Sequence, residues 1–274
     1  MIRVKVRLID IARIANVSVA TVSIVLNDPN TTRISKSKKE EIMSIAEELN
    51  YFPNKAAQSL VTNRSQTIGL VIPDIENPFF STFAKVVEQL LRQYGYVVII
   101  MNTLEDHEND PGVIRSLRQR NVDGMIIALS SKTFTEDKKV KAVLKRLDVP
   151  YVLVDRILNN FNANQVYFNN KQGEYLVTKY LIDNGHRKIG YISTQDHAMT
   201  GFYRHQGYIK ALKEAGIEVN DNFIRHGIYD AKTGYAFAEE LYNEGITAIA
   251  CANDLIAYGV QKRLFEMGLR VPED

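Results

Sequence analysis

Residues 8–27 contain two short stretches with the apolar spacing of helices, separated by one polar turn. The apolar positions of each stretch fall on one helical face: Leu8, Ile11, Ala12, Ala15, Val22, Val25 and Leu26. Asn16 suits the left-handed residue of a tight turn, and Ser18 is a good N-cap for the second helix. The exposed N-terminus of such a helix favours a phosphate group. The pattern predicts a helix-turn-helix, in which the second helix reads duplex DNA.

A third helix is predicted to begin near Ser37. Ser37 and Glu40 have the spacing of a capping box, and apolar residues then recur at helical spacing until Tyr51 and Pro53 end the pattern. Residues 1–65 hold ten Lys and Arg against six Asp and Glu, whereas the rest of the chain holds 24 against 26. An ordinary three-helix bundle is the alternative, but the basic balance favours a unit attracted to phosphate.

Residue 67 begins a long region in which β-rich runs alternate with helical periodicity. Strands are expected at 68–72, 96–101, 125–129, 151–154, 189–193 and 248–252. Helices are expected between them, near 80–94, 113–120, 138–147, 173–183, 203–215, 233–243 and 255–267. The alternation implies parallel sheets with helices on both faces. With 274 residues, 45% of them hydrophobic, the chain has room for more than one domain.

Several runs along the chain resemble one family of proteins. The N-terminal ones are VSVATVS at 17–23, Leu26-Asn27, and ELNYFPN at 48–54. Others follow in the order that this family shows: IGLVIPD at 68–74, NPFF at 77–80, VDG at 122–124, NGHRKIGY at 184–191 and AND at 252–254. Together they resemble the LacI family of bacterial transcription regulators.

This resemblance implies an all-α helix-turn-helix head and an α/β body of the periplasmic-binding-protein type with two doubly wound lobes. Three segments follow: the head at 1–53, a hinge helix and linker at 54–66, and an effector-binding and dimerisation domain at 67–274, with an N-lobe near 67–160 and a C-lobe near 161–274. In the family, the residues that match the end of this chain lead into a further strand and helices. We therefore expect a truncated C-lobe that lacks roughly 60 residues, one acidic cleft ligand among them.

The DNA-binding residues are expected on the second helix and in the hinge. The expected set is Ser18, Val19, Ala20, Thr21, Ser23, Ile24, Asn27, Asn54, Lys55, Ala57 and Leu60. The resemblance implies that the hinge folds on operator DNA in a dimer, where Ala57 approaches base edges and Leu60 wedges between base pairs. Packing of Leu60 on the body is the alternative. The family usually has Arg where this chain has Ile24, so an unusual half-site is expected.

A ligand site is expected at the carboxyl ends of the strands, where open parallel sheets bind ligands. Strand ends give Asp74, Asn77, Phe79, Asp155 and Asn253, and the family resemblance implies three further positions: Thr200, Arg204 and Tyr229. Ser130 and Thr194 also follow strands. Charged and amide groups suit sugar hydroxyls, and aromatic rings stack on an apolar sugar face. Turn or helix capping by Asp155 and Asn253, and a core position for Phe79, remain open alternatives.

Enzyme and metal motifs are not found in the sequence. The sequence lacks a phosphate loop, a nucleotide-binding glycine pattern, a nucleophile elbow and a zinc-protease motif. Cys251 is the single cysteine, and the five histidines show no ligand spacing on a helix, so neither a metal nor a cofactor is expected. The N-terminus lacks the apolar run of a signal peptide, and no run of about 18 apolar residues occurs, so we expect a cytoplasmic location.

The function expected from these observations is that of a homodimeric, sequence-specific repressor. Its partners would be double-stranded operator DNA and a small effector, a sugar or derivative, and no membrane. Effector binding would close the cleft, shift the hinge helices and change operator affinity. Nucleobases and protein corepressors are alternative effectors. A transport-type solute-binding protein is the alternative function, but it would need export and would lack the head.

Overall fold

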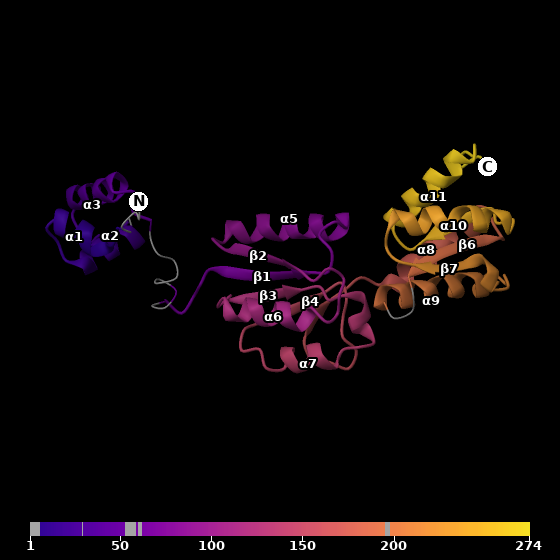
Figure 1. The fold of residues 1–274 in the computed structure, drawn as a ribbon, viewed down its shortest axis with the longest axis horizontal. Helices are drawn as coiled ribbons and strands as arrows, with labels where there is room; N and C mark the ends of the chain where they lie inside the picture. The colour runs from indigo at the N-terminus through magenta and orange to yellow at the C-terminus, as the bar shows by residue number, and fades with distance from the viewer. Residues whose placement is uncertain (1–5, 29, 53–58, 60–61, 195–197) are drawn as a thin grey trace. The chain divides into compact units, whose positions relative to one another are not determined.

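The computed structural model describes the chain outside residues 1–5, 29, 53–58, 60–61 and 195–197 (Figure 1). The chain consists of two compact units. The first unit is Met1–Ser65 and the second is Gln66–Asp274. Among the described residues, no single helix is long and apolar enough to span a bilayer; only the bent helix pair Leu8–Ile14 and Val19–Asn27 reaches that length and composition together.

The described residues of the first unit form three helices: α1 (Leu8–Ile14), α2 (Val19–Asn27) and α3 (Lys36–Glu48). Their shared core consists of Ile11, Ala12, Ala15, Val22, Val25, Ile42 and Ala46. The axes of α1 and α2 turn by 108°, within the range of a helix-turn-helix. Asn16 has a φ of 51°, and Ser18 Oγ accepts a hydrogen bond from Thr21 N at 3.0 Å, which confirms the predicted turn and cap.

The predicted start of α3 is wrong. The N-cap is Ser35, whose Oγ accepts from Lys38 N at 3.4 Å, so Ser37 and Glu40 lie inside the helix and form no capping box. Both serines have the residue type for a cap, and tertiary contacts decide between them. Lys38 donates its Nζ to the carbonyl of Ala15 at 3.1 Å, which ties this early turn to the end of α1.

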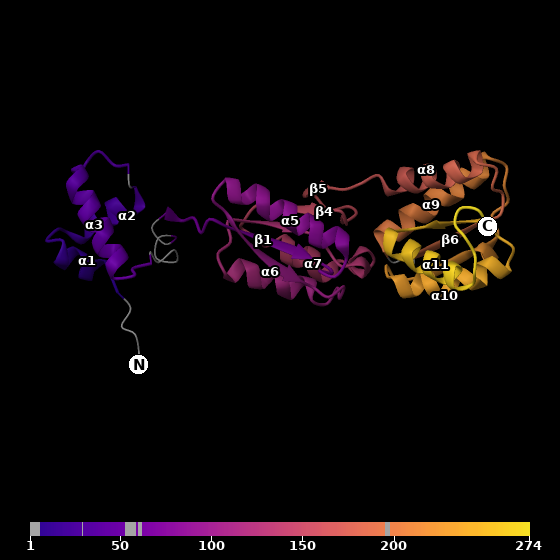
Figure 2. The same ribbon diagram turned by 90° about the horizontal axis from the view of Figure 1, so that it is seen from above.

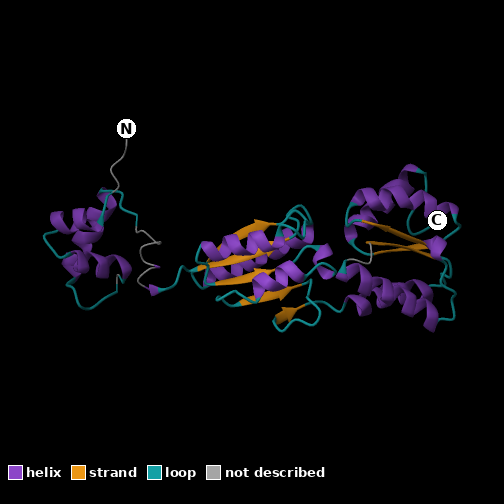
Figure 3. Ribbon diagram, turned by 60° about the horizontal axis from the view of Figure 1, so that its bottom comes forward, coloured by secondary structure: helices purple, strands orange, loops and turns teal. Residues whose placement is uncertain are grey.

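The second unit begins with a five-stranded parallel sheet of order β2-β1-β3-β4-β5. Its strands are β1 (Thr67–Ile72), β2 (Val97–Asn102), β3 (Gly124–Ile127), β4 (Tyr151–Val154) and β5 (Asn164–Val166). Helix α5 (Pro78–Gln93) covers one face, and α6 (Asp110–Gln119) and α7 (Lys138–Leu144) cover the other (Figures 1 and 3). Alternate residues of β1 supply both cores: Leu70 and Ile72 pack toward α5, and Val71 packs with α6 and α7.

The sequence did not predict β5, the last strand of the first sheet. Residues 164–166 pair with β4, so the chain leaves the first sheet after Val166 rather than near Asn160. The strand has three residues, two of them polar, and carries no apolar run to detect. Gln165 fixes it locally, because its Oε1 accepts from Leu158 N at 2.8 Å.

A second parallel sheet, of order β7-β6-β8, follows. Its strands are β6 (Ile189–Thr194), β7 (Ile224–Gly227) and β8 (Ala248–Cys251), and its helices are α8 (Asn170–Asp183), α9 (Met199–Glu214), α10 (Ala231–Asn243) and α11 (Asp254–Glu266). Helices α8 and α9 pack on one face and α10 and α11 on the other (Figure 2). Gly207 of α9 allows close packing on α8, because a Cβ there would lie 2.3 Å from the Lys171 carbonyl oxygen. The sequence missed β7, whose residues also lack an apolar run.

Candidate functional site

The outer face of α2 is the candidate surface for nucleic acid. Val22 and Val25 are fully buried, whereas Val19 is 40% exposed and Ala20 and Asn27 are exposed. The intervening residues Thr21, Ser23 and Ile24 are half-buried. The face therefore combines small apolar and hydroxyl groups of low height, which suits close approach to a groove.

Local hydrogen bonds fix the polar side chains of this face. The hydroxyl of Ser18 lies 2.8 Å from that of Thr21, and Asn27 Nδ2 donates to Ser23 Oγ at 3.2 Å. These contacts favour one rotamer for each of the side chains that take part, at the beginning and at the end of α2. Four further residues of the predicted set lie outside the described residues and stay predictions: Asn54, Lys55, Ala57 and Leu60.

The second unit contains a pocket of about 1120 Å³ at the carboxyl ends of strands from both sheets. Seven of the eight predicted ligand residues line it: Asn77, Phe79, Asp155, Thr200, Arg204, Tyr229 and Asn253. Asp74 does not line it. Instead, Asp74 Oδ1 accepts from Glu76 N at 2.9 Å and closes the turn after β1. Following a strand is therefore not sufficient to place a side chain in the pocket.

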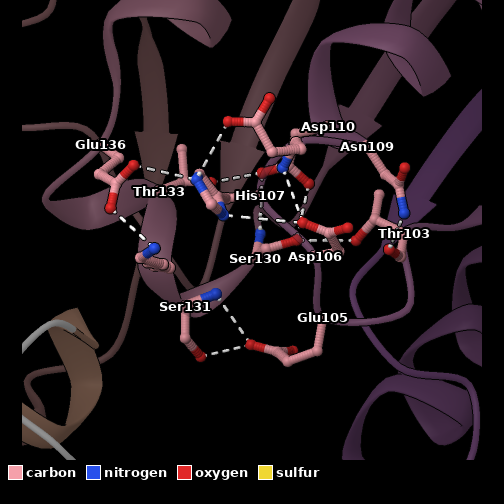
Figure 4. Close-up of polar contacts among 12 residues, drawn as sticks. Thr103, Glu105, Asp106, His107, Asn109, Asp110, Ser130, Ser131, Thr133 and Glu136 are labelled. Atoms are coloured by element: carbon pink, nitrogen blue, oxygen red, sulfur yellow. Dashed lines mark hydrogen bonds and ion pairs between the residues drawn. The ribbon is translucent and has the colours of Figure 1, made fainter.

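Ser130 also follows a strand without lining the pocket. Its hydroxyl donates to Asp110 Oδ1 at 2.8 Å, and its backbone N donates to Asp110 Oδ2 at 3.2 Å (Figure 4). Thr133 Oγ1 donates to the same carboxylate at 2.5 Å. Burial raises the pKa of Asp110, and these hydrogen bonds oppose the shift. The network anchors α6 to the end of β3 beneath the pocket side of the sheet.

Arg204 is held at the pocket wall by two polar contacts. Its Nε donates to Asn170 Oδ1 at 2.9 Å, its Nη1 donates to the Ala252 carbonyl, and its guanidinium lies 5.8 Å from the ring centroid of Tyr229. Tyr229 is fixed in turn by its hydroxyl contact with Thr200 Oγ1 at 2.7 Å. The guanidinium is thus oriented before any ligand binds, which lowers the entropic cost of binding.

Asp155 and Arg156, which directly follow β4, also line the pocket. Asp155 has a φ of 62°, a left-handed conformation that strains a residue with a Cβ and that occurs at functional sites. Burial raises the pKa of its carboxyl, while the charges of Arg156 and Arg204 lower it. Arg156, which the sequence analysis missed, lies over Phe80 and donates to Glu105 Oε1 at 2.7 Å. The wall therefore presents an acceptor beside a buried cation.

Helix capping and pocket lining are both found for Asn77 and Asn253, whereas the core position considered for Phe79 is wrong. Asn77 and Asn253 both cap helices, since their Oδ1 atoms accept from Phe79 N and Ile256 N at 3.0 Å. Each also lines the pocket. Phe79 is no core residue: its ring is 43% exposed and packs edge-on against Phe168 with centroids 6.2 Å apart. An aromatic surface thus borders the polar groups.

Glu174 is a buried carboxyl that the sequence analysis missed. It lines the pocket at 5% exposure, and Thr178 Oγ1 donates to it at 3.4 Å. Burial raises its pKa to about 7, with the nearby charge of Arg204 opposing the shift. A sequence signal existed, because Asn170, Glu174, Thr178 and Ile182 recur every fourth residue and form the buried stripe of α8.

Two family-level profiles match the chain. Residues 7–54 match the profile described as "Bacterial regulatory proteins, lacI family", and residues 65–274 match "Periplasmic binding proteins and sugar binding domain of LacI family". Among curated proteins, the HTH-type transcriptional repressor PurR of Vibrio vulnificus (strain CMCP6) is 36% identical over 268 residues, which is 97% of this chain and 78% of the relative. The repressor of the same name from Vibrio atlanticus is 35% identical over the same shares.

Solved structures show the same fold. The lac repressor dimer bound to operator and the anti-inducer ONPF superposes with a TM-score of 0.86 at 28% identity, covering 99% of this chain and 81% of that one. The transcription regulator CcpA of Lactococcus lactis gives a TM-score of 0.68 at 32% identity, covering 76% and 75%.

Proposed function

The chain belongs to the LacI family of bacterial regulatory proteins, and from that premise we propose how its head and its pocket work as one repressor. The head binds a DNA operator, two chains act together as a homodimer, and a small molecule in the pocket sets operator affinity. The observation that carries the proposal is the joint presence of an exposed, capped α2 and a separate pocket with preoriented charged groups. A DNA-binding repressor works where the chromosome is, so we place it in the cytoplasm.

The head supports a specific division of labour. Residues on the outer face of α2 read base edges in the major groove, while the basic balance of residues 1–65 supplies attraction to phosphates. The hinge set of Asn54, Lys55, Ala57 and Leu60 adds minor-groove contacts when two hinges fold together on DNA. Two hinges that fold together on DNA must be correctly spaced. A change in their spacing is therefore the means by which ligand binding in the pocket would alter operator affinity.

The pocket supports a polyhydroxylated effector, a sugar or sugar derivative. Asp155 offers a charged acceptor, Arg204 offers directed donors, and the ring of Phe79 offers a surface for an apolar sugar face. An effector that contacts both Asp155 and Arg204 favours a closed arrangement of the lobes. Closure would change the distance between the hinges of the dimer, and operator affinity would change with it.

The DNA part is tested with an operator selected from a random duplex library by the full chain. We expect binding to weaken with salt, log K falling with log salt by about 0.9 for each phosphate neutralised. A chain without residues 1–62 should not bind. Equal operator affinity of this shortened chain would contradict the assignment of DNA binding to the head.

The effector part is tested by calorimetric titration against sugars, sugar phosphates and purines. Arg204→Ala should abolish the effector response and leave operator binding intact. Asp155→Asn should weaken binding of a hydroxylated ligand by about 1.5–3 kcal/mol, if two hydrogen bonds to a charged group are lost. Asp74→Asn is the matched control, because Asp74 does not line the pocket. Titrations like those of the unmodified chain for both pocket variants would place the ligand elsewhere.

A transport-type solute-binding protein fits the body but not the whole chain. Residues 7–54 match the regulatory head, and the PurR relatives, which are repressors rather than enzymes, align over 97% of the chain. The absence of turnover together with retention on duplex DNA would separate a repressor from both a transport protein and an enzyme.

A further inference from the structure

A histidine and two carboxylates from two chain segments meet at one end of the first sheet. His107 and Glu108 lie between β2 and α6, and Glu136 lies just after the short helix η1 (Ser131–Phe134). His107 Nε2 is 3.4 Å from Glu108 Oε1 and 3.1 Å from Glu136 Oε2 (Figure 4). The ligand atoms of the three residues all lie within 4.8 Å of one another, and none of the three residues lines the pocket.

These separations fit the coordination shell of a zinc ion. With Zn–N and Zn–O bonds of about 2.0–2.2 Å, neighbouring ligand atoms of a tetrahedral site are roughly 3.3 Å apart. The separations of 3.1 and 3.4 Å at His107 lie on either side of that value. The imidazole sets this cluster apart from surface acids, because imidazole nitrogen prefers zinc over calcium or magnesium.

A second set of charged groups orients the three ligands. Asp106 Oδ1 lies 3.7 Å from His107 Nδ1, on the side of the ring opposite the two glutamates. A carboxylate there favours the tautomer with hydrogen on Nδ1, which turns the Nε2 lone pair toward the glutamates. Lys132 and Lys139 contact the other carboxylate oxygens, Glu136 Oε1 at 2.9 Å and Glu108 Oε2 at 2.5 Å.

We propose that His107 Nε2, Glu108 Oε1 and Glu136 Oε2 bind one Zn²⁺ ion, with water in the fourth position. The spacing of the histidines gives no hint of this site, because His107 and Glu136 lie 29 positions apart and meet only through the fold. Three protein ligands and a water are a common zinc arrangement.

A zinc ion here would join two segments that also support the pocket. Ser131 N donates to Glu105 Oε1 at 2.8 Å, and the same carboxylate accepts from Arg156 Nη1 at 2.7 Å. Glu105 and Ser131 belong to the two segments that zinc would tie together. The ion would therefore stiffen the support of Arg156, which lines the pocket.

The test is a titration of the full chain, stripped of metal by a chelator, with ZnCl₂. We expect one ion per chain, no measurable binding at this site in His107→Ala, and weaker binding in Glu108→Gln and Glu136→Gln. Asp106→Asn should weaken affinity about 10–100-fold, as loss of an outer carboxylate does. MgCl₂ and CaCl₂ should not replace zinc. Amide exchange in residues 105–110 and 131–136 should slow on zinc addition.

His186→Ala is the matched control, since His186 Nδ1 lies 2.9 Å from Thr247 Oγ1 and far along the chain from the cluster. This variant should bind zinc like the unmodified chain. Cys251 does not compete, because burial raises its pKa to about 12 and keeps the thiol protonated. Unchanged zinc affinity in His107→Ala would overturn the proposal. So would no binding in the unmodified chain, which would mean that the contacts of His107 with the two glutamates hold no metal ion.

Discussion

The outer face of α2 and the wall of the pocket differ most in where they hold charge. Helix α2 carries no charged residue from Val19 to Asn27. The pocket wall carries five: Asp155, Arg156, Glu174 and Arg204, which are partly or fully buried, and Asp254, which is exposed. The difference agrees with the partners that we propose for the two surfaces. A helix that enters a groove needs shape and exposed edges, whereas a small polar ligand needs strong, dry, preoriented charges.

The two sites also depend on different kinds of support. The face of α2 rests on an apolar core of seven buried residues in a unit of 65 residues, where each side chain carries a large share of the stability. The pocket charges cost free energy to bury and persist only because the larger body stabilises them. Substitutions in the apolar core should therefore lower the stability of the head. Substitutions of the buried charges should either lower or raise the stability of the body.

The largest expected effect is on the head. Ile42→Ala removes a fully buried side chain and should cost about 2–5 kcal/mol, which is most of the stability of so small a unit. Amide exchange should show α1 to α3 unprotected and operator affinity lost, with residues 66–274 unchanged. Ile14→Ala, at a residue 58% exposed, is the control. Equal protection of the head in both variants would break the comparison.

The next effect concerns the buried charge of Glu174. Its folded pKa of about 7 lies above the ordinary 4.5, so the folded state binds the proton more tightly than the unfolded state does. Ionisation of this carboxyl therefore lowers the free energy of unfolding progressively as the pH rises from about 4.5 to 7. Above pH 7 the loss of stability is complete. Glu174→Gln should remove this penalty and stabilise the body by roughly 3 kcal/mol at pH 8, with little change at pH 4.

Urea unfolding of the body at both pH values measures this effect. Glu218→Gln, at an exposed carboxyl, serves as the control and should leave the pH profile unchanged. A Glu174→Gln variant that is destabilised at pH 8 would mean that the charge pairs favourably with Arg204. The interaction of Glu174 with Arg204 would then outweigh the cost of burying the Glu174 charge.

A third effect tests whether α2 reads DNA without charge. Ile24→Arg should shift a selected half-site toward guanine, since a bidentate Arg–guanine contact is worth about 1–3 kcal/mol of discrimination. Ile24→Ala should bring no such shift. If the unmodified chain already selects the half-site that is usual for the family, Ile24 does not face the bases. The assignment of base recognition to the uncharged outer face of α2 would then be wrong.

The smallest effect separates structure from contact within the head. Ser18→Ala and Ser35→Ala each remove an N-cap, whose backbone N–H partners lie at 3.0 and 3.4 Å, and each should cost about 1 kcal/mol of stability. Operator affinity should fall further for Ser18→Ala, because we propose that the N-terminus of α2 binds a phosphate of the operator. Equal losses of affinity in both variants, measured by fluorescence anisotropy, would mean that Ser18 acts only as a cap.

The head was predictable from the sequence almost residue by residue. Asn16 takes the predicted left-handed turn, Ser18 caps α2, and the apolar positions of α1 and α2 form the core. The one error, the start of α3, arose where two serines offered equal local caps and a contact from Lys38 to α1 favoured the earlier one. Neighbouring positions of a helix differ by only 1.5 Å along its axis, so local sequence distinguishes poorly between two nearby cap residues. Contacts with other helices then decide which residue begins the helix.

The body was predictable in outline and not at its edges. Periodicity revealed six strands and seven helices, because their apolar runs face the clusters of buried side chains on both sides of each sheet. It missed β5 and β7, which are short strands that gain their hydrogen bonds from neighbours rather than from an apolar pattern. It also assigned Asp74 to the pocket, where the structure uses that carboxylate to close a turn.

The sequence by itself determined most of the secondary structure, the family and seven of the residues that line the pocket, because periodicity, caps and motif residues act over a few positions along the chain. The tertiary structure decided which charges share one environment. Arg156 and Glu174 enter the pocket wall, and Glu136 meets His107, only through packing of distant segments. Burial, pKa and metal coordination depend on distances in space, and a local pattern along the chain does not encode those distances.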